Sequence, residues 1–385
     1  MEKPARIPEL DGLRGLAILL VIFFHYTNGE SLTRLSGLAY YVQRSAASSW
    51  TGVNLFFVLS GFLIGGILVD ARGSDSYFRT FYARRFFRII PIYYLWICLY
   101  IALVSAAGQA IRLHSFSGKA LPRGFEVYAH FLFIQNLIPN GESSQSGLWG
   151  SWFGHLWSLA VEEQFYLLAP LMIWWLSPRR LPAVLLGIIC GFPFIRIALF
   201  FHIHQIDATR VMPSNADALA LGMLAAIAWR APAFRQWLAG HIHQLYFGAG
   251  LFFVGFGFLW WYAPSSESFP MVSFGSTWIA IFYALLVLIV LAASKGWIAR
   301  AMRASWLREV GRVSYCMYII HLVVNLFFHF VFLHARPQIT TLPGVAVSLL
   351  AAVGTYTLAL LSWRILEAPL VQIGHRYRYL MATGP

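Results

Sequence analysis

The stretch LDGLRGLAILLVIFFHY, residues 10–26, has the length and apolar character of a membrane-spanning helix, yet it carries Asp11, Arg14 and His25. Charged or titratable side chains inside a span are costly, so they usually face protein or water and serve a purpose. Arg14 and His25 are eleven residues apart, about three turns plus 20° on a helix, so both point the same way with a rise of roughly 16 Å between them. The pattern predicts one face with a cation near one side of the membrane and an imidazole near the other. The alternative is that Arg14 extends to lipid headgroups and His25 caps the helix end.

The composition of the whole chain is that of a multi-pass membrane protein. Of the 385 residues, 59% are hydrophobic and only 11% are charged, against about 25% charged in soluble proteins. The formal net charge of +13 comes from short basic clusters between apolar runs, which predicts loops in contact with membrane lipids and argues against nucleic-acid binding. Asp11 and Arg14 interrupt the first run, so we expect no cleavable signal peptide. The three cysteines lie alone in apolar runs, and no metal site is predicted.

Apolar runs of spanning length predict the topology. They lie near 10–28, 52–70, 87–106, 155–176, 182–203, 212–229, 244–262, 272–293, 313–334 and 344–363. The orientation of every later span depends on whether a shorter apolar run, at 127–138, also crosses the membrane. If it does not span, 20 of the 28 basic residues lie inside, whereas spanning would move twelve of them outside. We therefore predict an all-α bundle of about ten transmembrane helices with both termini cytoplasmic and 127–138 re-entrant or interfacial.

The same pattern predicts one domain without a soluble module. Residues 1–370 are expected to form a single transmembrane domain, and residues 371–385 a short basic cytoplasmic tail. Pro369 is expected to break the last helix soon after it leaves the membrane. The small residues of GVNLFFVLSGFLIG, at 52–65, would let another helix approach closely.

A second polar stripe lies in GHLWSLAVEEQFYLLAP, residues 154–170, at the helical spacings i, i+3, i+7 and i+11. Its members are His155, Ser158, Glu162 and Tyr166. Glu162 would lie about 10 Å deep in the outer half, at a depth similar to that of His25, where a carboxylate can orient an imidazole and raise its basicity. The alternative is a structural polar contact between packed helices. The stripe leaves open whether Glu162 or Glu163 is the functional carboxylate.

A third cluster, in YARRFFRIIPIYY at 82–94, places Arg84, Arg85 and Arg88 at the cytoplasmic start of the third span. Clustered guanidinium groups bind phosphate through forked hydrogen bonds. The alternative is topogenic charge that contacts lipid phosphates. Because Arg14 is expected at the same depth, the cluster favours a shared anionic ligand on the inner side.

Two further regions carry polar residues inside predicted spans. In VGRVSYCMYIIHLVVN a stripe typical of a cavity lining has the spacings i, i+4, i+7 and i+11, although a lone histidine there is more often a packing residue. Its members are Ser314, Tyr318, His321 and Asn325. Asp217, in SNADALALG, and Arg196 are similar cases. They would pair with each other or with Glu162, or line a pathway.

Taken together, these motifs resemble the acyltransferase family 3 of integral membrane O-acyltransferases, which modify bacterial surface sugars. The resemblance is carried by LDGLRGLAILLVIFFH, GVNLFFVLSGFLIG, RRFFRIIP, HLWSLAVEEQFYLLAP, DALALG and VSYCMYIIH, in family order from residue 7 to about 370. Two departures stand out. Asn54 replaces a residue that is usually acidic, and we expect no second, hydrolase-like module after the last helix.

The resemblance implies an enzyme of the bacterial inner membrane that uses acyl-CoA, commonly acetyl-CoA, as donor. The implied acceptor is a hydroxyl of a lipid-linked or exported glycan such as lipopolysaccharide, and no oligomeric state is implied. The matching residues are Arg14, His25, Arg85, Arg88 and the glutamate of the SLAVEEQF motif.

The resulting hypothesis places the coenzyme A phosphates at Arg14, Arg85 and Arg88, with the thioester arm along the Arg14–His25 face. His25, oriented by Glu162, acts as general base on the acceptor, a role that contributes about 10²–10⁴-fold in rate. A covalent acyl-histidine intermediate is the open alternative. Further polar residues are expected to contact the substrate, namely Asp11, Ser158, Tyr166, Asp217, Tyr318 and His321.

Two rival functions use the same polar residues. A transporter or flippase of an anionic glycolipid or acyl carrier would line a cavity without making a bond. A scaffold subunit of a polysaccharide assembly complex would tolerate substitutions in the polar stripes. Because no inverted repeat typical of transporters is visible, the enzyme is the favoured interpretation.

Overall fold

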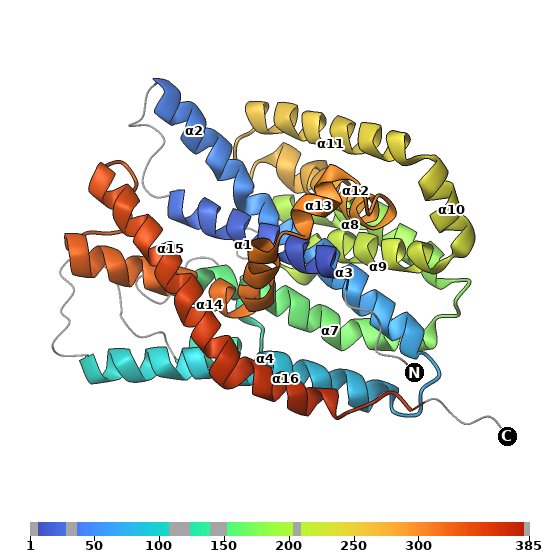
Figure 1. Ribbon diagram of the computed structural model, residues 1–385, viewed down its shortest axis with the longest axis horizontal. Coiled ribbons are helices and arrows are strands. Elements are labelled where there is room, and N and C mark those ends of the chain that lie inside the picture. Colours follow the sequence, from blue (N-terminus) through green and yellow to red (C-terminus); the bar gives the residue numbers. More distant parts are fainter. Residues whose placement is uncertain (1–6, 28–36, 108–123, 139–151, 203–208, 381–385) are drawn as a thin grey trace. The chain divides into compact units, whose positions relative to one another are not determined.

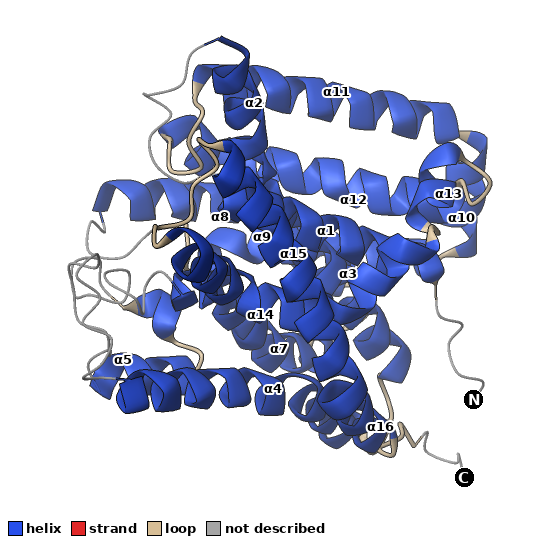
Figure 2. Cartoon of the chain, turned by 60° about the vertical axis from the view of Figure 1, so that its left-hand side comes forward, coloured by secondary structure: helices blue, strands red, loops and turns tan. Residues whose placement is uncertain are grey.

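The computed structural model describes residues 7–27, 37–107, 124–138, 152–202 and 209–380. Every regular element within these ranges is a helix or a helical turn, and none is a strand (Figure 2). The predicted all-α class is therefore confirmed for the described part of the chain.

Eight helices in the described ranges are long and apolar enough to cross a membrane. They are built on α1 (Pro8–Thr27), α3 (Gly52–Ala71), α4 (Tyr77–Ala107), α8 (Leu181–His202), α11 (Ile242–Tyr262), α12 (Ser276–Ala292), α14 (Ser305–Leu333) and α15 (Leu342–Ser362). A ninth candidate is the pair α9 (Ala216–Arg230) and α10 (Pro232–Gly240), bent by 96° at its break. All nine lie where spans are predicted, so a polytopic bundle is confirmed.

The remaining predicted span, 155–176, forms helix α7 (Trp157–Trp175) but does not meet the same apolar criterion. The helix is 19 residues long, enough to cross the hydrocarbon layer. It is less apolar because Glu162 and Glu163 follow each other in its second turn. The prediction of ten spans thus depends on α7 crossing the membrane with two carboxyl groups.

The segment 127–138 does not form a spanning helix. It folds into the end of α5 (Gly124–Phe131) and a 3-10 turn, η3 (Gln135–Leu137). Eight residues of α-helix are about 12 Å long, well short of the hydrocarbon thickness. The segment packs into protein, since Tyr94 donates to the Phe131 carbonyl at 2.6 Å and Gln135 to the Leu156 carbonyl at 2.9 Å.

The chain folds into two compact units. The first contains Met1–Ile67, Leu176–Phe200 and Pro213–Tyr315, and the second contains Leu68–Trp175, Phe201–Met212 and Cys316–Pro385. The shorter elements are α2 (Gly37–Ala47), α13 (Trp297–Met302), α16 (Ala368–His375), the 3-10 turns Ser48–Thr51, Gly154–Leu156 and Met212–Asn215, and the π turns Met271–Gly275 and Trp363–Glu367.

In the first unit, α1 is enclosed by close helix contacts. A Cβ atom added at Gly12 would lie 1.9 Å from the Met302 carbonyl oxygen, and one at Gly311 would lie 1.9 Å from the Asp11 carbonyl oxygen. Gly61 of α3 meets α9 in the same way, because its Cβ would lie 2.0 Å from the Leu219 oxygen. The predicted close helix approach at GVNLFFVLSGFLIG is confirmed there. Helices α11 and α12 run side by side (Figure 2).

In the second unit, α15 does not end at the predicted proline break. It continues through the π turn Trp363–Glu367 into α16, which lies along α4 (Figure 1). The expectation that Pro369 breaks the helix is wrong. Proline cannot donate to the carbonyl of Ile365, and a wider turn accommodates the chain without that bond.

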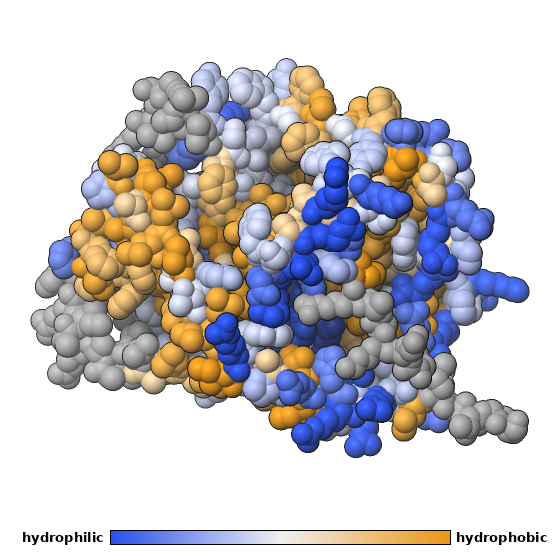
Figure 3. Space-filling model, in the orientation of Figure 1, coloured by the Kyte–Doolittle hydropathy of each residue, from blue (hydrophilic) through white to orange (hydrophobic). Residues whose placement is uncertain are grey.

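Large apolar side chains remain exposed along the spanning helices, as in Figure 3. On α11, Phe247 is 76% exposed, Leu251 56% and Phe258 66%, and these residues share one helix face. Such a face suits lipid, because a soluble monomer rarely exposes a continuous apolar patch of this kind.

Candidate functional site

The α1 stripe that carries Arg14 and His25 faces protein. Ile18 and Val21 lie between them on the same face at helical spacing, and both are 0% exposed. Arg14, Asp11 and His25 are themselves half-buried. Because α1 is continuous from Pro8 to Thr27, the predicted shared face of Arg14 and His25 is confirmed.

His25 is oriented by its own helix. Its Nδ1 lies 2.9 Å from the Val21 carbonyl oxygen. A carbonyl oxygen only accepts, so Nδ1 carries the proton and Nε2 carries the lone pair. The backbone therefore orients the imidazole and leaves it in the tautomer that a general base needs at Nε2, while an additional contact with Glu162 stays a prediction.

The α7 stripe is buried and bonded to α14 within the second unit. Ser158 Oγ lies 2.5 Å from the Tyr318 hydroxyl, and that hydroxyl donates to the His155 carbonyl oxygen at 2.8 Å. His155 Nε2 lies 2.7 Å from the Tyr318 carbonyl oxygen, and the rings of His155 and His321 are 4.7 Å apart. The two predicted stripes thus meet, and His321 is 0% exposed.

Glu162 is connected to the arginine cluster through Tyr166. The Tyr166 hydroxyl donates to Glu162 Oε2 at 3.2 Å, and the Arg85 guanidinium lies 5.1 Å from the centre of the Tyr166 ring. Glu163 lies within electrostatic range of both Glu162 and Arg85, and its buried Oε1 has no hydrogen-bond partner among the described residues. Both glutamates therefore belong to one cluster with Arg85.

The guanidinium of Arg85 is held by aromatic faces. It lies 6.0 Å from the Phe81 ring centre as well as over Tyr166, and it makes no hydrogen bond or ion pair with a described residue. Such stacking uses the face of the guanidinium and leaves its N–H groups at the edge. Its neighbour Arg84 donates Nε to the Tyr377 carbonyl oxygen at 2.9 Å. Arg88, one turn further along α4, is half-buried.

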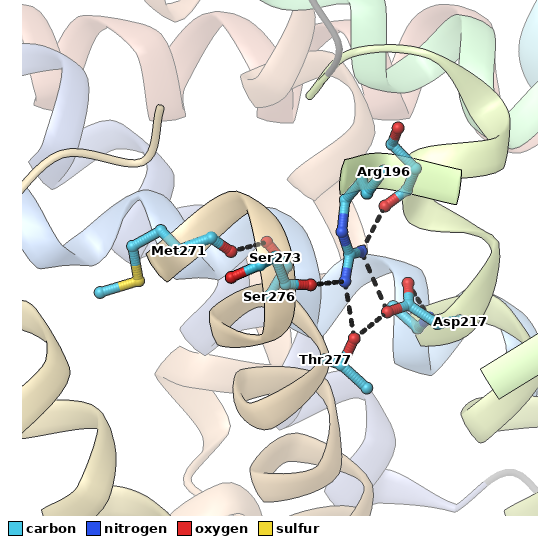
Figure 4. Close-up of polar contacts among 8 residues, drawn as sticks. Arg196, Asp217, Met271, Ser273, Ser276 and Thr277 are labelled. Carbon is cyan, nitrogen blue, oxygen red and sulfur yellow. Dashed lines mark hydrogen bonds and ion pairs between the residues drawn. The ribbon is translucent and has the colours of Figure 1, made fainter. Parts of the chain in front are cut away.

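Asp217 lies in a different, buried hydrogen-bonded cluster of the first unit (Figure 4). Its Oδ2 is 3.0 Å from Nη1 of Arg196 on α8, and both side chains are almost completely buried. Thr277 donates to the same carboxylate, and the Ala218 amide donates to Oδ1 at 2.9 Å. Pairing of Asp217 with Arg196 was one of the predicted alternatives and is confirmed. Its role as a substrate contact stays a prediction.

The remaining contacts of Arg196 are main-chain carbonyls and one hydroxyl. They are Ser214 O at 2.6 Å, Ser273 O at 3.0 Å and Thr277 Oγ1 at 2.7 Å. Ser273 lies in the π turn before α12, and this wide turn presents a carbonyl oxygen that Arg196 takes up (Figure 4).

Two pairings predicted from sequence join residues of different units. His25 and Arg14 belong to the first unit, and Glu162, Arg85 and Arg88 to the second. The pairing of His25 with Glu162, and of Arg14 with the other arginines, stays a prediction. Within the second unit, six predicted site residues form two groups, Arg85 with Tyr166 and Glu162, and Tyr318 with Ser158 and His321. Glu162 lies within electrostatic range of Tyr318, which connects the two groups.

Sequence reasoning missed an amide pair beside this set. Gln164 Nε2 donates to Asn136 Oδ1 and to the Phe133 carbonyl, both at 2.9 Å, which ties α7 to the turn after α5. Phe133 has φ 54°, a left-handed conformation that is strained for a bulky residue. Gln164, the third consecutive polar residue in VEEQF, was the available signal. The α14 stripe also continues to His329, which is fully buried.

Comparison with known proteins places these residues in a family. The model of the acyltransferase domain family matches residues 7–364, nearly the whole chain. The chain is 26% identical over 389 aligned residues to O-acetyltransferase OatA of Staphylococcus aureus, covering 98% of this chain and 59% of that protein. It is also 26% identical over 376 residues to peptidoglycan O-acetyltransferase OatA of Listeria monocytogenes, covering 96% and 56%. No solved structure matches.

The described helices thus form an all-α polytopic membrane bundle that carries two hydrogen-bonded polar stripes. This chain belongs to the acyltransferase domain family. It spans less than two thirds of the length of these relatives.

Proposed function

We propose that this chain is a membrane-bound O-acetyltransferase that transfers an acetyl group from acyl-CoA to a hydroxyl of a cell-envelope glycan. The relatives are named O-acetyltransferases, and one is named for peptidoglycan, so a peptidoglycan-type glycan is the acceptor class we assign. The comparisons lend no support to lipopolysaccharide. The observation that carries the proposal is the protein-facing stripe of α1 with Arg14 and His25.

The arginine cluster fits a donor that carries phosphate groups. The edge N–H groups of Arg85 are uncommitted among the described residues, and its face is fixed by Phe81 and Tyr166. A guanidinium fixed in this way binds phosphate oxygens with little loss of side-chain entropy. We assign Arg85, Arg88 and Arg14 to the phosphates of coenzyme A, and place the enzyme in the bacterial cytoplasmic membrane, where that donor is reached from the cytosol.

His25 is the general base of the proposed reaction. Nε2 removes the proton of the acceptor hydroxyl as the oxygen attacks the thioester carbonyl carbon, and the C–S bond breaks as the ester C–O bond forms. The proton then passes to the departing coenzyme A thiolate. Attack by Nε2 itself would give an acyl-histidine that the acceptor hydroxyl cleaves in a second step, and both routes require the Nδ1–H tautomer set by Val21.

The test measures transfer of radiolabelled acetyl groups from acetyl-CoA to glycan by the full chain in proteoliposomes. His25→Ala is expected to lower kcat by about 10²–10⁴-fold. The matched control is His241→Ala, because His241 Nδ1 makes the same hydrogen bond, 2.8 Å to the Trp237 carbonyl four residues earlier. It is expected to leave kcat unchanged. Full activity of His25→Ala would refute the base assignment, and glycolipid movement without label transfer would identify a transporter.

A further inference from the structure

The residues that follow α16 form a segment pinned across the start of α4. We call residues 376–380 the strap. Six hydrogen bonds join its main chain to Ser74, Asp75, Ser76, Thr80 and Arg84. They include Ser76 Oγ to the Arg378 carbonyl at 2.8 Å and Leu380 N to Ser76 Oγ at 2.9 Å. Because the bonds use main-chain atoms, they fix the path of the strap whatever its side chains are.

The strap places two tyrosines against the arginines of α4. The Tyr379 ring lies 5.2 Å from the Arg84 guanidinium, and the Tyr377 ring lies 5.8 Å from that of Arg79. Helix α16 approaches α4 closely, since a Cβ added at Gly374 would be 3.3 Å from Phe87 Cβ. Hydrophilic atoms gather around the end of α16 in Figure 3. The strap therefore forms one wall of the arginine cluster.

The hydroxyl of Tyr379 is a polar group of the strap whose burial is not balanced by a hydrogen bond to a described residue. It lies within electrostatic range of both Arg84 and Arg85. Burial raises the pKa of Tyr379 although the two arginines lower it, so the hydroxyl stays protonated at neutral pH and can donate. A buried donor beside two cations whose N–H groups are largely uncommitted suits an anion with several acceptor oxygens.

We propose that the Tyr379 hydroxyl, together with Arg84 and Arg85, binds a phosphate group of the acyl donor, and that the strap is the segment that positions it. This inference rests on the proposed acyl-CoA donor. It assigns roles to Arg84, the neighbour of Arg85 on α4, and to Tyr379, which lies within electrostatic range of Arg85, in addition to the aromatic rings that hold Arg85. A phosphate of a lipid headgroup has the same chemistry, and the experiment separates the two sources.

The experiment measures the Kd of acetyl-CoA for the full chain in nanodiscs of phosphatidylcholine, with and without phosphatidylglycerol. Tyr379→Phe removes only the hydroxyl and keeps the ring over Arg84. It is expected to raise the Kd about 10-fold in both lipids, the effect of one hydrogen bond to a charged group. The matched control is Tyr377→Phe, on the same strap, which is expected to leave the Kd unchanged. Without donor, Tyr379→Phe is expected not to lower Tm, because no protein hydrogen bond is lost.

Each other outcome overturns a defined part of the inference. An unchanged Kd for Tyr379→Phe, with normal binding by the wild type, would refute the role of Tyr379 and leave the proposed function intact. If phosphatidylglycerol weakens binding by the wild type and Tyr379→Phe removes only that effect, the hydroxyl binds a lipid phosphate, and the assignment of Tyr379 to the donor phosphate is wrong. A wild type that binds no acetyl-CoA in either lipid would refute the proposed donor itself.

Discussion

Arg196 in the first unit and Arg85 in the second are both arginines on long helices, but their surroundings are opposite. Arg196 is 1% exposed and bonds Asp217, Thr277 and two carbonyl oxygens (Figure 4). Arg85 is half-buried between two aromatic rings and makes no hydrogen bond with a described residue. The difference teaches that a guanidinium whose four partners come from two distant stretches of chain holds a fold together, whereas one held by ring faces is available to a ligand.

The largest expected effect is on stability, and it concerns Arg196, whose guanidinium is hydrogen-bonded within the protein. Arg196→Met leaves the Asp217 carboxylate buried without its cation, and breaking such a pair costs about 3–5 kcal/mol. We expect a large fall in Tm, measured by thermal unfolding in detergent. The double variant Arg196→Met with Asp217→Leu is expected to recover much of the loss, because no lone charge remains. An unchanged Tm of the single variant would show that the cluster does not stabilise the fold.

The second prediction concerns the available arginine. Arg85→Met keeps a long side chain against Phe81 and Tyr166 but removes the charge and its donors. The KM for acetyl-CoA is expected to rise about 10–100-fold, with Tm nearly unchanged. Steady-state kinetics at saturating acceptor measures this. Equal changes in donor and acceptor KM would contradict a phosphate contact.

The third prediction concerns His130, a buried imidazole that stays neutral in the folded protein. Burial lowers the pKa of His130, on α5, to about 4, although its hydrogen bond to the Glu126 carbonyl opposes this. Below pH 6.5, His130 binds a proton in the unfolded chain but stays neutral in the folded chain. The free energy of unfolding therefore falls as the pH falls towards 4. The expected loss at pH 5 is about 2 kcal/mol relative to pH 7.5. His130→Gln should flatten this part of the Tm–pH profile, and an equally steep profile would exclude His130 as its source.

The smallest expected effect comes from the hydroxyl between Arg85 and Glu162. Tyr166→Phe keeps the ring under the guanidinium and removes the hydroxyl that donates the 3.2 Å hydrogen bond to Glu162. We expect kcat to fall about 2–10-fold at saturating donor, with an unchanged donor KM. Tyr166→Leu, which also removes the ring, should raise the donor KM as well. A rise in donor KM for Tyr166→Phe would mean that the hydroxyl itself contacts the donor.

The features that the sequence predicts well are local and periodic. The shared face of Arg14 and His25, and the stripes of Ser158 and of Tyr318, follow from helical spacing alone. Burial of Ile18 and Val21 then confirms that the first stripe faces protein. The non-spanning segment 127–138 followed from charge bias, which acts on whole loops and not on single contacts.

The features that the sequence does not predict depend on contacts between distant segments. The strap bonds Ser74 and Ser76 through main-chain atoms about 300 residues away, and such bonds leave no residue pattern. The π turn at Trp363–Glu367 admits Pro369 into a helix that a proline rule would end. The hydrogen bond between His25 and the Val21 carbonyl is local. Residue spacing equally allows His25 to bond a side chain such as Glu162, so spacing alone does not predict the backbone bond.

The bond from His25 to the Val21 carbonyl has a consequence for mutational scanning. Replacing any side chain of this protein, one at a time, leaves that carbonyl in place. A set of inactive variants would therefore identify His25 but not the Val21 carbonyl oxygen that fixes the position of its proton. The role of that oxygen would have to be tested by replacing the peptide bond itself.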